Sequence, residues 1–331
     1  KFKEQVVANI LITLFLITFV ISLISVRPFI KTVTNEIKFT YVAKEYKSNF
    51  NNDDYKKKDS TELSVNKNQD ENYIGIDTQI TLNLFENLKY DLKSIRLGQS
   101  VKPIYLTKLP KDLKKIKSTN KKKETFIKIV MPLILIENEK IIEDRNKLFK
   151  ILGKQSNSMG EKVWLKRRFK DYQIEKEDIA ELKLRMDIVP TSIAIAQAAK
   201  ESGWGTSRFA LEGNAIFGQW TWSGQGIAPL DRENNKNHKI LKFPILRASV
   251  KAYQNNLNTH KSYIKFREKR VKLRQKNKII NGLELTKTLD NYAETGSEYT
   301  KILSQIILQN RLMDFETVRL TSSSKKKELN L

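Results

Sequence analysis

The chain has 331 residues, and 61 lysines and arginines against 37 aspartates and glutamates give it a formal net charge of +24. It has no cysteine and two histidines, His238 and His260, which excludes disulfides, thiolate metal sites and cysteine nucleophiles. A histidine-based metal site or a Ser-His-Asp triad is improbable for the same reason, and no cofactor is expected.

The N-terminal segment is apolar enough to cross a membrane. Val6 to Val26 is a run of 21 residues without a charge, and a helix of that length spans roughly 30 Å. The SVRPFI segment that follows is a poor cleavage site. We therefore expect residues 1–30 to hold an uncleaved transmembrane anchor. A cleaved signal peptide is the alternative, and basic residues on both sides leave the orientation open.

A polar stretch and then a helical region follow the N-terminal segment. Residues 46–72 are polar with few aliphatic side chains, so 31–75 is expected to be a flexible tether. Residues 76–175 are expected to form a helical accessory region. Its long buried helix at 124–152 carries charges and Pro132, which argue against a second membrane span.

The C-terminal half is also predicted to be mainly helical. Glycine and proline with short alternating runs at 212–244 indicate a small β-lobe or an ordered loop. We expect a second folded domain over 176–315 and a disordered tail over 316–331. Helical patterns cover 159–170, 175–186, 190–201, 246–275, 282–292 and 298–312.

The densest basic segment is 261–278, with nine basic residues against one acid. Its aromatic residues match no nucleic-acid signature, so no nucleic-acid partner is expected. The segment is interpreted as a solvated basic helix, or as a surface attracted to an anionic polymer such as a cell wall.

Glu201 is placed where a helix should end. Pro190 suits the first turn of a helix, and Gly203 and Gly205 bracket Trp204 just after Glu201. The negative end of the helix dipole and a neighbouring indole both favour the neutral acid, which suits a general acid. The alternative is a solvated surface carboxylate beside a core tryptophan.

Aromatic and amide side chains follow Glu201 closely, and three of the four tryptophans fall within 204–222. Aromatic faces beside polar groups suit sugar rings, although a tryptophan-rich core is the alternative. Tyr292, just before a Gly-Ser turn, could hydrogen-bond a carboxylate or an N-acetyl group, or could simply pack in the core. The candidate substrate-binding residues are Trp204, Asn214, Phe217, Gly218, Gln219, Trp220 and Trp222.

The segment VPTSIAIAQAAKESGWGTSRFALEGNAIFGQW resembles the active-site segment of the Bax-like proteins. These belong to the glucosaminidase-domain group of glycoside hydrolase family 73, within the lysozyme-like superfamily. IYLTKLPKDL, MPLILIENEKIIEDR, FPILRASVKAYQNNLNTHKSY and LDNYAETGSEYTKILSQIILQN agree in the same order, so the similarity covers about residues 100–313. The resemblance implies a lysozyme-like helical domain with a small β-lobe.

The resemblance also implies roles for individual residues. Glu201 matches the catalytic glutamate that protonates the glycosidic oxygen, and Tyr292 matches a tyrosine near the cleft. Asn214, Phe217 and Gly218 match the motif that shapes the floor between the lobes.

The second catalytic acid has no clear match. Asp231 and Glu233 in the β-lobe are the candidates, and Glu212 is a weaker one. Glycoside hydrolysis usually needs such a second group, but assistance by the 2-acetamido group or a transglycosylase route would operate with Glu201 alone.

The expected function is that of an endo-β-N-acetylglucosaminidase anchored in the bacterial inner membrane through residues 6–26, with residues 176–315 as its catalytic domain. Its catalytic domain would lie in the periplasm and cleave peptidoglycan or another N-acetylglucosamine-containing glycan, with Glu201 as general acid. A lytic transglycosylase and a non-catalytic wall-binding scaffold are the alternatives.

Overall fold

The computed structural model describes residues 77–221, 226–228, 239–276, 279–321 and 329–330. The chain divides into two units, Lys1–Asn68 and Gln69–Leu331, and every described residue belongs to the second. The expected anchor and tether, as well as Trp222, Asp231 and Glu233, lie outside the described residues. Among the helices that are described, none has the length and apolar character that a membrane span requires.

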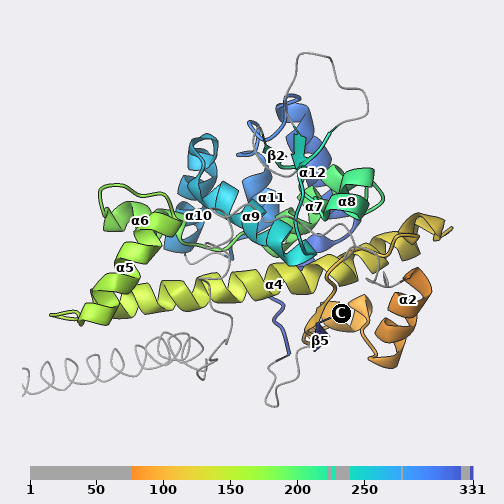
Figure 1. Ribbon diagram of the computed structural model, residues 1–331, viewed down its shortest axis with the longest axis horizontal. Coiled ribbons are helices and arrows are strands. Elements are labelled where there is room, and N and C mark those ends of the chain that lie inside the picture. The colour runs from red at the N-terminus through yellow and green to blue at the C-terminus, as the bar shows by residue number, and fades with distance from the viewer. Residues whose placement is uncertain (1–76, 222–225, 229–238, 277–278, 322–328, 331) are drawn as a thin grey trace, which may run out of the picture. The chain divides into compact units, whose positions relative to one another are not determined.

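The described part is mainly helical, as the sequence predicts (Figure 1). Its longer helices are α2 (Thr78–Asn87), α4 (Thr119–Leu152), α5 (Met159–Asp171), α7 (Thr191–Ser202), α9 (Leu246–Thr259), α10 (Ile264–Gln275) and α12 (Ser297–Gln309). Its shorter helices are α3 (Leu92–Arg96), α6 (Ile179–Arg185), α8 (Arg208–Gly213) and α11 (Gly282–Thr286), with 3-10 turns at Leu113–Lys115, Lys261–Tyr263 and Leu312–Phe315. The helix predicted at 282–292 is therefore shorter, and α8 was not predicted.

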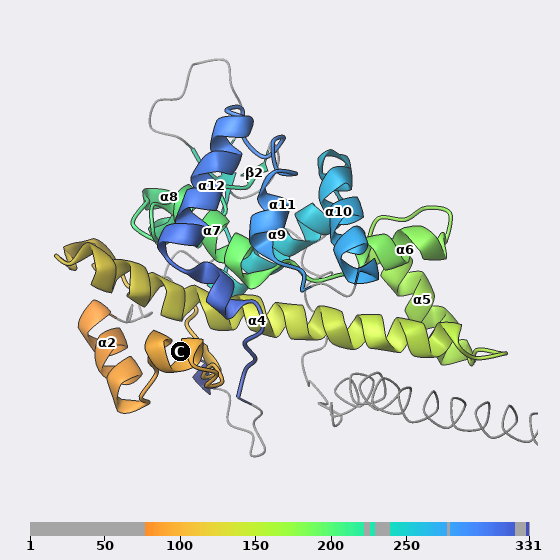
Figure 2. The same ribbon diagram turned by 180° about the vertical axis from the view of Figure 1, so that it is seen from behind.

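The long helix α4 continues through Pro132 because a distant tyrosine replaces the lost hydrogen bond. Proline has no N–H to donate to the carbonyl four residues earlier, which here belongs to Lys128. The hydroxyl of Tyr90 donates to that carbonyl at 3.1 Å. Figure 2 shows α4 running beneath most of the other helices, with α2 below one of its ends and α5 near the other.

The main hydrophobic core surrounds α7, which is buried along nearly its whole length. α7 packs against α4, α11, α12 and the 3-10 turn at Leu312–Phe315. The approach of α11 is close, since a Cβ on Gly282 would lie 2.2 Å from Ser192 Oγ. The core joins residues from Phe85 to Phe315, so the predicted accessory and catalytic regions share it.

The small β-lobe is confirmed in its described part. Strands β2 (Trp220–Thr221), β4 (Lys239–Leu241) and β3 (Gly226–Ile227) form an antiparallel sheet in that order. Ile240 of the central strand is the register partner of Trp220 on one side and of Ile227 on the other.

The tail expected to be disordered from 316 is held in place over its first residues. Val101 N–H donates to the carbonyl of Arg319, and Thr321 N–H donates to the carbonyl of Val101, both at 2.8 Å. Farther along, β5 (Leu329–Asn330) pairs in parallel with β1 (Ile104–Tyr105). Backbone pairing with the N-terminal part of the domain orders these residues, which local composition could not indicate.

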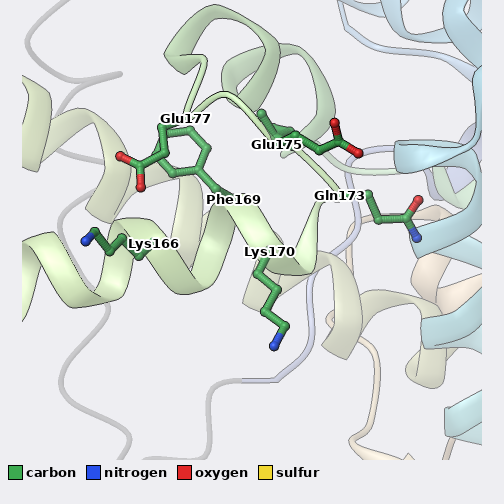
Figure 3. Close-up of a pocket in the computed structure, with 7 residues that line it drawn as sticks. Lys166, Phe169, Lys170, Gln173, Glu175 and Glu177 are labelled. Atoms are coloured by element: carbon green, nitrogen blue, oxygen red, sulfur yellow. The ribbon is translucent and has the colours of Figure 1, made fainter.

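A second, smaller core lies between α4, α5 and α6. It contains Leu148, Phe169, Tyr172, Leu182 and Met186. A pocket beside it is bordered by Lys166 and Lys170 of α5 and by the loop that carries Glu175 and Glu177 (Figure 3).

The helix predicted over 246–275 is interrupted, and the prediction of a solvated basic helix at 261–278 is wrong in part. His260 has an extended backbone between α9 and the following 3-10 turn. Arg267 and Arg270 of α10 are 1% and 0% exposed. Both donate hydrogen bonds to backbone carbonyls, including Arg267 to His260 and Arg270 to Ile188, and these contacts compensate for lost hydration.

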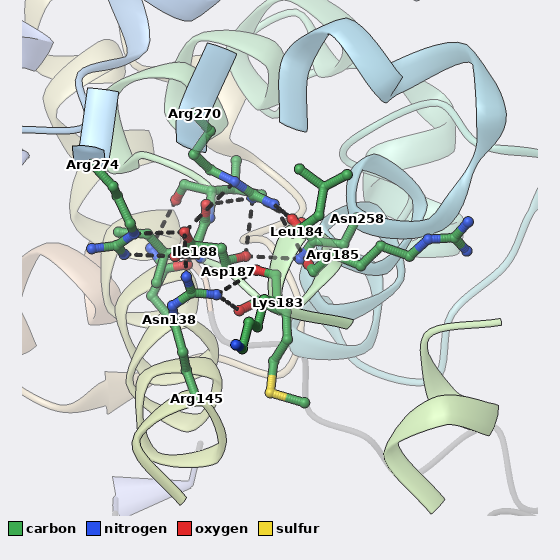
Figure 4. Close-up of polar contacts among 12 residues, drawn as sticks. Asn138, Arg145, Lys183, Leu184, Arg185, Asp187, Ile188, Asn258, Arg270 and Arg274 are labelled. Atoms are coloured by element: carbon green, nitrogen blue, oxygen red, sulfur yellow. Dashed lines mark hydrogen bonds and ion pairs between the residues drawn. The ribbon is translucent and has the colours of Figure 1, made fainter. Parts of the chain in front are cut away.

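The fully buried Asp187 is the centre of this polar network (Figure 4). Arg274 donates to both of its carboxylate oxygens at 2.6 Å, and nitrogens of Arg270 and Arg145 lie 3.9 Å away. Burial opposes ionisation, but the hydrogen bonds from Arg274 and the three positive charges outweigh it and lower the pKa of Asp187. The network joins α4, α10 and the end of α6, and the sequence analysis missed it.

Candidate active site

The turn after α7 fixes the position of Glu201. Gly203, Trp204 and Gly205 all have positive φ angles, of 58°, 57° and 78°, which end the helix as predicted. Trp204 N–H donates to the carbonyl of Ala199 at 2.9 Å. A side chain at position 205 would collide with Phe126 of α4, because its Cβ would lie 2.8 Å from that ring.

The indole of Trp204 packs against α4. It meets Phe126 edge to face with centroids 5.9 Å apart, and the ammonium group of Lys123 lies 5.0 Å from its ring centroid. This residue thus contributes to the contact between α7 and α4, and its predicted substrate-binding role stays a prediction.

Glu201 itself is partly buried and has a specific partner. Tyr299 of α12 donates its hydroxyl to Glu201 Oε1 at 2.8 Å. Burial raises the pKa of Glu201, while the Tyr299 hydrogen bond and the charge of Lys200 lower it to a smaller extent. Since Oε1 accepts the hydrogen bond from Tyr299, Oε2 is the oxygen that carries the proton when the carboxyl group is neutral.

Gly218 lies against that second oxygen. Its φ is +61°, and a Cβ at this position would lie 3.4 Å from Glu201 Oε2. The backbone after Phe217 can approach the carboxyl group closely because residue 218 has no side chain.

A buried chain of hydrogen bonds leads to Tyr299, the partner of the Glu201 carboxyl group. Gln197 Nε2 donates to the Tyr299 hydroxyl at 3.0 Å, and the Tyr253 hydroxyl donates to Gln197 Oε1 at 2.7 Å. Helices α7, α9 and α12 each contribute one of these side chains, so the position of Glu201 depends on all three.

Tyr292 supports the site by stacking, and its hydroxyl is bound to the backbone. It donates to the carbonyl of Phe217 at 3.2 Å, and its ring stacks on Tyr299 with centroids 5.5 Å apart. Phe217 in turn stacks on Tyr253 at 3.8 Å. The tyrosine that contacts the carboxyl group is therefore Tyr299, which the sequence analysis missed although it lies in the same LDNYAETGSEYTKILSQIILQN segment as Tyr292.

Asn214 and Gln219 form hydrogen bonds with residues in and just after β4. Asn214, with φ +51°, caps α8 and donates through Nδ2 to the carbonyls of Phe243 and Pro244. The backbone carbonyl of Gln219 accepts a hydrogen bond from Leu241 of β4. Trp220 lies in β2, and these three positions shape the lobe that follows the Glu201 turn.

Glu212 is an exposed residue of α8 whose carboxylate lies 3.6 Å from Arg208, which is the arrangement of a surface ion pair. Across the described ranges, no group of three or more histidine, aspartate or glutamate side chains could hold a metal ion. The structure thus brings together Glu201, Phe217, Gly218 and Tyr292 from the predicted set, and adds Tyr299, Gln197 and Tyr253.

A partly buried carboxyl group at a helix end, hydrogen-bonded by a tyrosine and with a pKa raised by burial, is the kind of group that acid catalysis uses. A family model described as Mannosyl-glycoprotein endo-beta-N-acetylglucosaminidase, the glucosaminidase domain, matches residues 176–312, which contain this site. The chain is also 33% identical over 207 residues to Protein bax of Escherichia coli (strain K12), covering 60% of this chain and 74% of that protein.

The chain therefore belongs to the Bax-like group of glucosaminidase-domain proteins. No solved structure gave a significant match. Membership of this family supports a glycosidase that acts on a glycan substrate.

Proposed function

We propose that this protein is an endo-β-N-acetylglucosaminidase that cleaves peptidoglycan strands, with Glu201 as its general acid. The observation that carries the proposal is the environment of Glu201 within the glucosaminidase-domain match. Burial raises its pKa, one oxygen is bound by Tyr299, and the other faces Gly218.

In the first step, Glu201 donates its proton from Oε2 to the glycosidic oxygen as the C–O bond breaks. The resulting carboxylate keeps the hydrogen bond from Tyr299 on Oε1, which stabilises the negative charge where it develops. Water then attacks the sugar carbon, and a base must take its proton.

The base or nucleophile is the open part of this mechanism. Asp231 and Glu233, which follow the β3 strand in sequence, are proposed for this role, and the 2-acetamido group of the substrate is the other candidate. A lytic transglycosylase would need no attacking water, because the sugar's own hydroxyl closes an anhydro ring.

Anchoring through residues 6–26, with the catalytic domain in the periplasm, also belongs to this proposal.

The test compares full-length protein with Glu201→Gln on purified peptidoglycan. We expect the substitution to slow fragment release about a hundredfold to ten-thousandfold, the usual contribution of a general acid. Glu212→Gln, on an exposed side chain close by in sequence, is the matched control and should leave the rate unchanged. A Glu201→Gln protein that digests as fast as the parent would overturn the proposal.

Mass spectrometry of the released fragments separates the candidate reactions. Reducing N-acetylglucosamine ends support the glucosaminidase, and anhydro-muramic ends identify a transglycosylase. Binding to peptidoglycan without any released fragment identifies a scaffold. Asp231→Asn and Glu233→Gln then identify the second acid: loss of turnover in one of them assigns the role, and full turnover in both favours the acetamido route.

A further inference from the structure

Helix α5 carries an exposed face that combines basic and apolar side chains. Its members recur at the three- and four-residue spacing that defines one side of a helix, and all are exposed. Met159 is 75% exposed and Val163 is 53% exposed. The α5 basic face consists of Met159, Lys162, Val163, Lys166, Arg167 and Lys170.

The opposite side of α5 is fixed to the domain. Phe169 is buried in the second core, and Trp164 and Leu165 pack against it. Arg168 forms ion pairs with Asp144 and Asp171. The α5 basic face is therefore held in one orientation instead of rotating toward the core.

The four cations of the α5 basic face have no acidic partner among the described residues. The acidic residue within the helix, Glu161, is paired with Lys154 instead. Glu175 and Glu177 lie on the next loop, and Figure 3 shows Lys170 directed away from both. The face therefore presents four positive charges and two apolar side chains to solvent.

We propose that the α5 basic face docks onto an anionic lipid surface. Lysine and arginine bind the phosphates of lipid headgroups, while Met159 and Val163 reach the boundary of the acyl chains. A hydrated polyanion would engage the cations but leave both apolar side chains in water. The apolar pair is the reason to assign the face to a membrane surface and not to a soluble polymer.

The position of α5 separates this surface from the candidate active site. Lys147 of α4 lies over the ring of Trp164 of α5, whereas the turn after Glu201 packs on Phe126. These two positions are separated by roughly 30 Å along α4 at 1.5 Å per residue. Docking through α5 would hold the membrane at one end of α4 and leave the carboxyl group of Glu201 free, whatever its substrate.

The absence of cysteine allows a direct test in the full-length chain. Val163→Cys is labelled with an environment-sensitive fluorophore, and Leu97→Cys, an 82% exposed position after α3, is the matched control. The probes are vesicles of phosphatidylcholine alone and of phosphatidylcholine and phosphatidylglycerol in equal parts. All variants share residues 6–26, so differences between them report on α5.

We expect the label at 163 to shift to the blue and to become protected from iodide on the anionic vesicles, but not on phosphatidylcholine. The label at 97 should stay accessible to quenching by iodide on both kinds of vesicle. Replacing Lys162 and Lys166 by glutamine should weaken the lipid titration of the blue shift about fivefold per residue. Lys287→Gln with Lys301→Gln, two exposed lysines elsewhere, should leave it unchanged.

Two results would overturn the proposal. One is a label at 163 that stays open to iodide on anionic vesicles, and the other is equal protection by soluble polyphosphate or by suspended peptidoglycan. Peptidoglycan cleavage by the α5 variants in lipid-free solution should match the parent. The outcome is therefore independent of the proposed glucosaminidase activity.

Discussion

At the scale of single residues, two opposing effects act on the carboxyl group of Glu201, the proposed general acid. Burial favours its neutral form, while the Tyr299 hydrogen bond favours the carboxylate. A general acid needs both, because it must hold a proton before the reaction and be stabilised after losing it. Tyr299 is thus a positioning residue that acts through Glu201.

Tyr299→Phe tests this role. Without its hydrogen bond the pKa of Glu201 rises further, so the basic limb of the kcat/KM profile should move to higher pH. The maximal rate should fall about tenfold or more, because the developing carboxylate loses a hydrogen bond to a charged group. The measurement is peptidoglycan cleavage across a range of pH.

Tyr172→Phe is the control for Tyr299→Phe, since it removes another buried tyrosine hydroxyl in the second core. It should leave the pH profile in place. A Tyr299→Phe protein whose rate falls with no change of profile would assign Tyr299 a purely structural role.

At the scale of elements, helix α7 is held at both ends. Glu201 stands at its C-terminal end, and Glu316 binds its N-terminal end by accepting the N–H of Thr191 at 3.0 Å and the Ser192 hydroxyl. Glu316 also accepts the N–H of Gly282 at 2.7 Å, which ties α11 to α7. Pro190 provides no side-chain cap, so a residue distant in sequence replaces it.

Glu316 makes folding stability dependent on pH. Burial raises its pKa from 4.5 to about 7. Between these two pH values, the folded state holds a proton on Glu316 that the unfolded state has lost. Its contribution to stability is complete below about pH 4.5 and falls as the pH rises to about 7, by at most about 3 kcal/mol.

Glu316→Gln removes this titration. The difference in unfolding free energy between parent and variant should therefore change in the variant's favour between about pH 5 and about pH 8. Urea denaturation at both values measures it. Glu212→Gln should show no such trend, and a constant difference for Glu316→Gln would contradict the assignment.

At the scale of the whole described domain, Asp187 joins segments that are far apart in sequence. Arg145 comes from α4 and Arg270 and Arg274 come from α10, and one buried carboxylate offsets part of their charge (Figure 4). Backbone carbonyls accept further hydrogen bonds from Arg270, as that of Leu184 does from Nη2. Removing the carboxylate leaves like charges together in a buried place.

Asp187→Asn should lower the free energy of unfolding by about 3–5 kcal/mol. Urea denaturation measures this loss, and hydrogen exchange should show it first in α6 and α10. Glu294→Gln, an exposed carboxylate, should stay within about 0.5 kcal/mol of the parent. An Asp187→Asn protein as stable as that control would show that the arginines are satisfied by the carbonyls alone.

The sequence by itself determined the features that depend on neighbouring residues. The helical periodicity, the end of α7 after Glu201 and the glycine-rich β-lobe follow from local propensity and turn chemistry, and the structure confirms them. The resemblance carried by ESGWG and NAIFG gave the family, which the comparisons confirm.

Contacts between distant residues were decided by tertiary structure alone. Local pattern left open whether Tyr292 contacts a carboxyl group, an N-acetyl group or the core, and packing of α12 on α7 brings Tyr299 to the carboxyl group. The local pattern also suggested that Arg270 is solvated. In the structure Arg270 is fully buried, and it donates a hydrogen bond to the carbonyl of Leu184 in α6. A hydrogen bond or an ion pair depends on where two chain segments meet in space, and composition and periodicity describe each segment separately.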